Sequence, residues 1–283
     1  MDASRRGFLG GAIGASLMPA FAGGGQGGGG GATGSDAGEL KLGVASYSFR
    51  EFSRKIAIAG CKKLNTPYIN FKDMHLPLNT SKADMEKFHK DVEKAGLTIL
   101  GGGNVSFSKD DEADIRSKFE YAKAAGMPVI VCAPTHETLP KMEKYVKEYN
   151  IKIAVHNHGP EDKHFPTPQS VLAVVKNMDS RCGLCMDIGH TARTGADIVA
   201  SLAEAGPRLL DMHVKDLSDP MKKDSQVPVG DGKLPIPAIF RQLKKMNYQG
   251  GVMLEYEIDD TDPLPGMIKS FAYMRGVLAG IHG

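Results

Sequence analysis

The chain alternates short apolar runs with longer segments in which apolar residues recur every three or four positions. The first pattern predicts buried β-strands and the second predicts amphipathic helices. The predicted strands span residues 40–49, 68–76, 97–107, 128–134, 151–160, 182–190, 209–217 and 250–257. The predicted helices span 52–64, 81–95, 110–125, 138–148, 168–177, 196–205 and 235–246, with a final helix within 261–283. Eight such alternations over roughly 240 residues predict an α/β fold, a single (β/α)8 TIM barrel.

The N-terminal residues depart from this pattern. Arg5 and Arg6 precede an apolar, Gly/Ala-rich stretch that ends in the small-x-small sequence Ala20-Phe21-Ala22. Residues 1–22 therefore resemble a twin-arginine-type signal peptide, which predicts an exported, periplasmic protein. Residues 23–38 read as a Gly-rich flexible linker, and the barrel domain is expected over 39–283. The sequence leaves open whether the signal is cleaved or kept as an anchor, and it predicts no membrane span in the mature chain.

Composition narrows the class of partner. The net charge is only +2 and the chain has no tryptophan, which argues against a nucleic-acid partner. Cys182 and Cys185 form a C-x-x-C pair, but residues i and i+3 of a strand point to opposite faces. We therefore interpret all four cysteines as small buried hydrophobic residues. Homo-oligomer formation is left open by the sequence.

Metal-seeking side chains gather at the ends of the last four predicted strands. Side chains alternate along a strand, so those of one face are two residues apart. The residues concerned are His156 and His158, then Asp187 with His190 just beyond, then Asp211, His213 and Lys215, and finally Glu255 and Glu257. In a parallel barrel these ends meet at the C-terminal mouth, where barrel enzymes keep their active sites. Two or three imidazoles with two carboxylates suit one divalent Mn, Co, Zn or Fe ion better than Ca or Mg.

Three of these runs resemble a known family when they are taken in succession. CMDIGH (185–190), DMHVKD (211–216) and VMLEYE (252–257) resemble the sugar phosphate isomerase/epimerase group of the xylose isomerase-like TIM barrels, over about residues 40–258. That superfamily includes ketose 3-epimerases, hydroxypyruvate isomerase, inosose dehydratase and endonuclease IV. The resemblance implies that Asp187, His213 and Glu255 bind a metal ion. It also implies that His190 contacts the substrate.

One position departs from the epimerases of that group. They end the fifth strand with a Glu that binds metal and acts as a base, whereas this chain has IAVH (153–156), which places His156 there. The HNH pattern at 156–158 is similar to exported members of the group and to inosose dehydratase. A second base would then come from His158, Glu161, Lys215 or another group.

Strand-end placement and resemblance together give the expected site. The expected metal ligands are His156, Asp187, His213 and Glu255. The expected catalytic residues are Glu255, His158, His190 and Lys215. The expected substrate-binding residues are His75, Lys72, Glu161 and Arg193. We expect one divalent ion as cofactor and a small-molecule carbohydrate as substrate.

The expected chemistry is proton transfer beside a carbonyl group. A divalent ion that chelates a ketone and the neighbouring hydroxyl acidifies the C–H between them and holds the enediolate. Return of the proton gives epimerisation or isomerisation, whereas loss of a β-oxygen makes the enzyme a lyase or dehydratase acting on a keto-sugar or glycoside. Export favours free sugars over phosphorylated ones. An endonuclease IV-like hydrolase is disfavoured because the loop 218–234 has no histidine. A non-catalytic sugar-binding barrel is disfavoured because the metal set is intact.

Overall fold

The structure is a closed parallel barrel. It is a computed structural model that describes residues 39–281. The strand order is β1-β10-β7-β6-β5-β4-β3-β2, and each neighbouring pair in it is parallel. The strands are β1 Lys41–Ala45, β2 Tyr68–Phe71, β3 Thr98–Phe107, β4 Val129–Pro134, β5 Lys152–His156, β6 Cys182–Asp187, β7 Leu209–Val214 and β10 Gly251–Leu254. The predicted TIM barrel is confirmed. The predicted signal peptide and linker lie outside the described residues.

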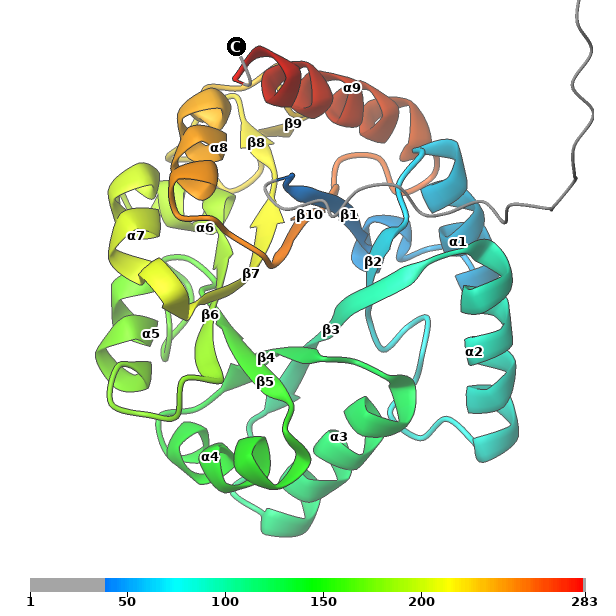
Figure 1. Ribbon diagram of the computed structural model, residues 1–283. Helices are drawn as coiled ribbons and strands as arrows, with labels where there is room; N and C mark the ends of the chain where they lie inside the picture. The colour runs from blue at the N-terminus through cyan, green and yellow to red at the C-terminus, as the bar shows by residue number, and fades with distance from the viewer. Residues whose placement is uncertain (1–38, 282–283) are drawn as a thin grey trace, which may run out of the picture. The chain divides into compact units, whose positions relative to one another are not determined.

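Helices surround the strands (Figure 1). They are α1 Arg54–Lys63, α2 Lys82–Ala95, α3 Glu112–Ala125, α4 Thr138–Tyr149, α5 Pro168–Val175, α6 Ile188–Arg193, α7 Ile198–Ala205, α8 Ile236–Lys245 and α9 Leu264–Gly280. Local signals set several of their ends. The hydroxyl of Ser81 accepts from the N–H of Asp84 at the start of α2, and Gly96 ends that helix with a φ of 66°. None of the helices described here is long and apolar enough to cross a membrane.

An aspartate caps the N-terminus of α3. The carboxylate of Asp111 accepts from the N–H groups of Ala113 and Asp114, at 2.7 and 3.0 Å. Asp111 therefore bonds donors at the second and third helical positions.

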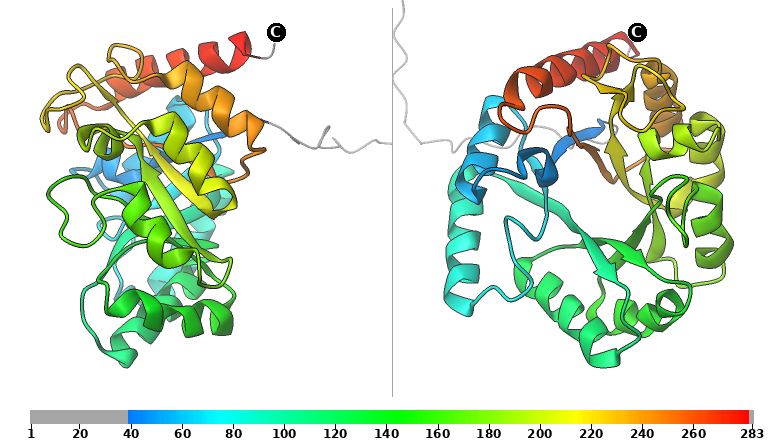
Figure 2. Two further views of the ribbon diagram at one scale, coloured as in Figure 1. Left: turned by 90° about the vertical axis from the view of Figure 1, so that its left-hand side faces the viewer. Right: turned by 180° about the vertical axis from the view of Figure 1, so that it is seen from behind.

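Two short elements were not predicted. The chain folds into α6 directly after β6, and the long loop after β7 contains a small antiparallel ribbon, β8 Asp216–Leu217 with β9 Gln226–Val227. The loops after β5 and β7 project from one end of the barrel (Figure 2). That end holds the carboxyl ends of all the barrel strands, because the strands are parallel.

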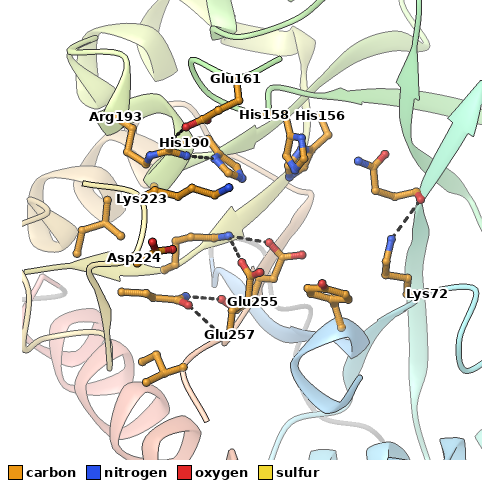
Figure 3. Close-up of a pocket in the computed structure, with 17 residues that line it drawn as sticks. Lys72, His156, His158, Glu161, His190, Arg193, Lys223, Asp224, Glu255 and Glu257 are labelled. Atoms are coloured by element: carbon orange, nitrogen blue, oxygen red, sulfur yellow. Dashed lines mark hydrogen bonds and ion pairs between the residues drawn. The ribbon is translucent and has the colours of Figure 1, made fainter. Parts of the chain in front are cut away.

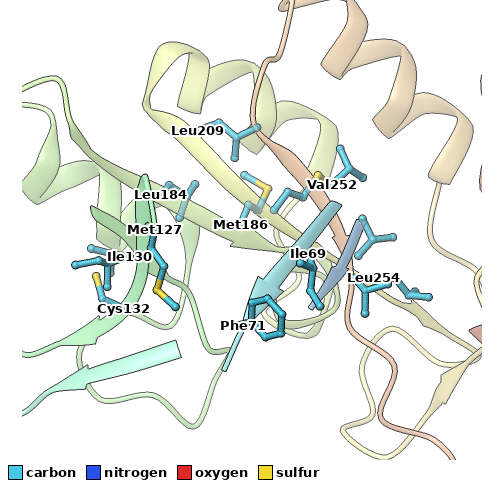
Figure 4. Packing of buried hydrophobic residues seen from close by; sticks show 14 of the residues in the cluster. Ile69, Phe71, Met127, Ile130, Cys132, Leu184, Met186, Leu209, Val252 and Leu254 are labelled. Atoms are coloured by element: carbon cyan, nitrogen blue, oxygen red, sulfur yellow. The ribbon is translucent and has the colours of Figure 1, made fainter. Parts of the chain in front are cut away.

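The core divides into two layers because side chains alternate along each strand. In β6, Leu184 and Met186 belong to the large cluster between strands and helices (Figure 4), whereas Cys185 belongs to a small cluster with Val131 and Ala154. Cys182 lies in the large cluster, so the two cysteines of the C-x-x-C pair point to opposite faces, as predicted. All four cysteines are buried free thiols.

The glycines of β3 allow a close approach of the neighbouring strand. Gly103 has a φ of 133°, and a Cβ built on it would lie 2.0 Å from the carbonyl oxygen of Val131 in β4. The register between β3 and β4 shifts between Gly102 and Val105 at this point. The irregularity lets Asn104 line the cavity described below.

Candidate functional site

The four expected metal ligands converge at the carboxyl ends of their strands. His156 ends β5, Asp187 ends β6, His213 lies in β7, and Glu255 follows β10 directly. Their ligand atoms all lie within 4.8 Å of one another. The parallel register explains this, because Asp187 is paired with His213 across β6 and β7.

The cluster has the donor chemistry of a transition-metal site. Nε2 of His156 lies 3.1 Å from Nδ1 of His213 and 3.6 Å from Oδ2 of Asp187. Nδ1 of His213 lies 3.3 Å from Oε2 of Glu255. Within the described residues, Oδ2 of Asp187 is buried with no hydrogen bond beyond its ion pair with Lys215. Two imidazole nitrogens and two carboxylate oxygens this close together fit a divalent ion.

The backbone around Asp187 is fixed by Asn157, which follows β5, and by Thr191 in α6. Its N–H donates to Oδ1 of Asn157, and its carbonyl accepts from the hydroxyl of Thr191 at 2.7 Å. Its own Oδ1 caps α6 by accepting from the N–H of His190. One carboxylate oxygen is thereby held by the helix, and the other is directed at the cluster. Asn157 was not predicted as a site residue.

Lys215 places a buried positive charge among the carboxylates of the site. Its Nζ lies 3.0 Å from Asp187, 2.8 Å from Glu255 and 2.7 Å from Glu257. Burial opposes ionisation of Asp187, but Lys215 and the nearby imidazoles outweigh it and hold the pKa of that carboxyl well below its ordinary value. His213 and Lys215 likewise overcome the effect of burial and hold the pKa of Glu255 low. Both carboxyl groups are therefore anions at neutral pH.

The two imidazoles in the cluster differ in their charge. Burial lowers the pKa of His156, whereas the Glu255 carboxylate outweighs burial at His213 and raises its pKa to about 9. Below them in the barrel, burial raises the pKa of Asp211 to about 7. Asp211 accepts from Nδ2 of Asn70 at 2.8 Å, so it forms a buried polar layer under the metal cluster rather than part of it.

A second group of side chains lies beside the metal cluster. The rings of His158 and His190 are 4.6 Å apart, and Arg193 donates to Nδ1 of His190 at 3.2 Å. Because a guanidinium group has no acceptor, the neutral ring of His190 carries its proton on Nε2. Burial lowers the pKa of His190 to about 3, which keeps the ring neutral. Arg193 is in turn paired with Glu161, whose pKa this contact lowers.

These residues line a cavity of about 640 Å³ (Figure 3). The expected residues Lys72, His158, Glu161, His190, Arg193 and Lys215 all line it, as do His156 and Glu255. On the side away from the metal cluster, Nζ of Lys72 lies 3.4 Å from the carbonyl oxygen of Asn104 and 5.4 Å from the ring centre of Tyr47. The polar residues that line the cavity but were not predicted as site residues are Tyr47, Asn104, Lys223, Asp224, Gln226 and Glu257.

His75 is not brought into this group. β2 ends at Phe71, and the N–H of His75 donates to the carbonyl of Lys72 in a tight turn. The buried ring lies 2.9 Å from the hydroxyl of Ser46 and 3.0 Å from the carbonyl of Phe52. Both ring nitrogens are thus bonded within the protein, and His75 organises the end of β2.

The fold and the cluster together define a TIM barrel with a candidate divalent-metal site at its catalytic end. The model of the xylose isomerase-like TIM barrel family matches residues 58–277, and the chain belongs to that family.

Curated relatives of the chain include proteins named inosose dehydratase. The chain is 27% identical over 160 residues to inosose dehydratase of Mesomycoplasma hyopneumoniae (strain 7448), covering 50% of this chain and 53% of that protein. The chain therefore spans about half the length of the curated relatives it matches.

Solved structures share the fold. The IOLI protein, whose crystal structure contains a zinc atom, has a TM-score of 0.71 at 18% identity, covering 85% of this chain and 99% of that chain. The 3-keto-D-glucoside 4-epimerase of E. coli has a TM-score of 0.66 at 16% identity, covering 84% of this chain and all (100%) of that chain.

Proposed function

We propose that this protein is a divalent-metal-dependent isomerase or epimerase that moves a proton at the carbon beside the carbonyl of a sugar or keto-sugar. The observation that carries the proposal is the convergence of His156, Asp187, His213 and Glu255 on one cavity, with ligand atoms within 4.8 Å. The resemblance of the chain to enzymes of sugar and cyclitol metabolism supports it.

Each group has a part that follows from its contacts. When bound, the ion supplies Lewis acidity, which polarises a substrate carbonyl and acidifies the adjacent C–H. Glu255 is held as an anion and acts as the base that takes this proton. His190 presents an N–H on Nε2, which suits it to donate to a substrate oxygen. Lys215 holds the carboxylates in place and keeps them ionised.

A second candidate is elimination, which would make the enzyme a dehydratase or lyase. A symmetric mechanism needs two carboxylate bases, and His156 stands where the second would be. The imidazoles of His158 and His190 lie on the other side of the cavity from Glu255 (Figure 3). One carboxylate base facing proton donors suits loss of a β-oxygen. The matched relatives named inosose dehydratase favour the same outcome.

Metal content tests the site without requiring a substrate. Protein purified without added metal is expected to carry about one Mn, Co, Zn or Fe ion per chain. Asp187→Asn is expected to lose it, whereas Asp260→Asn, at an exposed carboxylate, keeps it. His156→Ala is expected to lose the ion as well, and His89→Ala serves as its control. Equal metal in wild type and Asp187→Asn would remove the ligand assignment.

Activity is tested by proton NMR in D2O with free keto-sugars and 3-keto-glycosides. Deuterium beside the carbonyl with inverted configuration identifies an epimerase, deuterium at the neighbouring carbon of an aldose–ketose pair identifies an isomerase, and release of a β-substituent identifies a lyase. No exchange with the metal-loaded protein counts against proton abstraction.

Export through a twin-arginine-type signal belongs to the same proposal and favours free over phosphorylated substrates. It is tested by cell fractionation, where replacing Arg5 and Arg6 by Lys is expected to retain the protein in the cytoplasm.

A further inference from the structure

The segment that carries Glu255 extends beyond the backbone ladder of the barrel. β10 ends at Leu254, and the bond from the N–H of Glu255 to the carbonyl of Val214, at 3.0 Å, continues the pairing with β7. Beyond it, Nε2 of Gln226 donates to the carbonyl of Glu255 at 2.8 Å, and the N–H of Glu257 donates to Oε1 of Gln226 at 2.9 Å. One side-chain amide thus bonds both backbone groups.

The geometry of an extended chain explains why a glutamine suits this place. The carbonyl of one residue and the N–H of the residue two further on point to the same edge of a strand. A neighbouring strand would bond that pair with its own N–H and carbonyl, and an amide side chain offers the same donor and acceptor. Gln226 therefore takes the place of a strand neighbour.

The opposite edge of the segment is held in the same way. The hydroxyl of Ser48 accepts from the N–H of Tyr256 at 2.9 Å and donates to the carbonyl of Leu254 at 3.2 Å. With both edges bonded, the backbone torsions that aim the carboxylates of Glu255 and Glu257 are fixed. Those carboxylates are the two that meet Nζ of Lys215 from this side.

Gln226 is itself anchored through the ribbon. It is paired with Leu217 in the β8–β9 ladder. The buried carboxylate of Asp216, in the same ribbon, accepts from the N–H groups of Leu217, Gly230, Gly232 and Leu234, at 2.9 to 3.1 Å. Buried hydrogen bonds therefore hold the long loop after β7 in one conformation.

We infer that Gln226 is a positioning residue for the metal site: it fixes the backbone of residues 255–257 so that Glu255 meets the ion. The inference rests on the proposed function, because it assumes that Glu255 is a metal ligand. Partners that orient metal ligands typically contribute 10- to 100-fold to metal affinity.

Two substitutions separate the hydrogen bonds from the volume of the side chain. Gln226→Met keeps the length and loses both bonds. Gln226→Glu keeps the acceptor for the N–H of Glu257, but as an anion it cannot donate to the carbonyl of Glu255. Gln249→Met is the control, because Gln249 is an exposed glutamine that precedes β10 at the other end of the barrel.

The measurement is the dissociation constant of Zn²⁺ or Mn²⁺, from competition with a chromophoric chelator. Gln226→Met is expected to bind about 10- to 100-fold more weakly than wild type, and Gln249→Met is expected to match wild type. Gln226→Glu, which keeps the acceptor for the N–H of Glu257, is expected to bind the ion more tightly than Gln226→Met, a partial rescue that a merely loosened loop would not produce.

The failures of the two proposals are distinguishable. Equal metal affinity of wild type and Gln226→Met overturns the positioning inference and leaves the metal-dependent enzyme standing. A wild-type protein that binds neither ion overturns the proposed function and this inference with it.

Discussion

Replacing Lys215 by Met tests whether one ammonium group neutralises the metal site. The change removes the cation that lies 2.7 to 3.0 Å from three carboxylates, and Asp187 among them is fully buried. Methionine fills most of the same volume without charge. Removing one partner of a buried ion pair costs about 3–5 kcal/mol, because the remaining charge stays buried and unpaired.

The assay is thermal unfolding in EDTA and in excess divalent metal. For a domain of this size each kcal/mol shifts Tm by about 2–4 °C, so Lys215→Met in EDTA is expected to melt about 6–20 °C below wild type. A bound divalent ion supplies positive charge to the same carboxylates, so added metal is expected to narrow that gap. Lys215 holds the pKa of Asp187 low, and its stabilisation is therefore present at neutral pH and lost as the pH falls through the carboxyl range. The gap is expected to shrink in acid.

The control is Lys269→Met, which removes an exposed ion pair with Asp231. Exposed pairs contribute about 0–1 kcal/mol, so this variant is expected to melt close to wild type. The reasoning is refuted if Lys215→Met in EDTA melts as close to wild type as Lys269→Met does. It is also refuted if added metal raises the Tm of wild type and of Lys215→Met by the same amount.

Three further results are expected. Asp216→Asn points an amide NH2 at two of the four N–H groups from which the Asp216 carboxylate accepts, and should lower the free energy of unfolding in urea by about 2–4 kcal/mol. An unchanged urea midpoint would contradict the role of Asp216 in anchoring the loop. Burial raises the pKa of Cys61 and of Cys182 to about 12, and all four cysteines are buried. A thiol reagent near pH 8 should therefore label none of them before guanidinium is added. Rapid labelling of the native protein would contradict this burial. Phe119→Ala, in the core between α3 and β3, should cost about 3–5 kcal/mol by urea unfolding, and a loss below about 1 kcal/mol contradicts tight packing there.

The barrel was predictable because its signals repeat over whole elements. Apolar runs and amphipathic segments alternate eight times, and strand alternation then places His156, Asp187 and His213 on inward faces. Parallel strands bring those faces to one end, so no long-range information was needed to expect a cluster there.

The parts that were missed depend on contacts that leave no local pattern. β8 and β9 have two residues each, too few for any periodicity, and the bond between Gln226 and the backbone of Glu255 joins residues 29 positions apart. His75 lies apart from the other expected residues, because strand ends alone do not reveal that the chain turns after Phe71. Asn157 acts by fixing the backbone of Asp187, and any amide beside a strand end looks alike in sequence.

The group around Lys215 also has a consequence for electroneutrality. A metal-bound imidazole is neutral. With His213 as a ligand, the charges that remain are the three carboxylates of Asp187, Glu255 and Glu257 around one ammonium, which leaves an excess of two negative charges. A doubly charged cation cancels that excess, whereas a sodium ion would leave a negative charge in a poorly solvated place and a trivalent ion would overcompensate it. The number of acidic side chains that share a single lysine therefore sets the charge of the ion that the site favours. This preference does not depend on which other atoms would coordinate the ion.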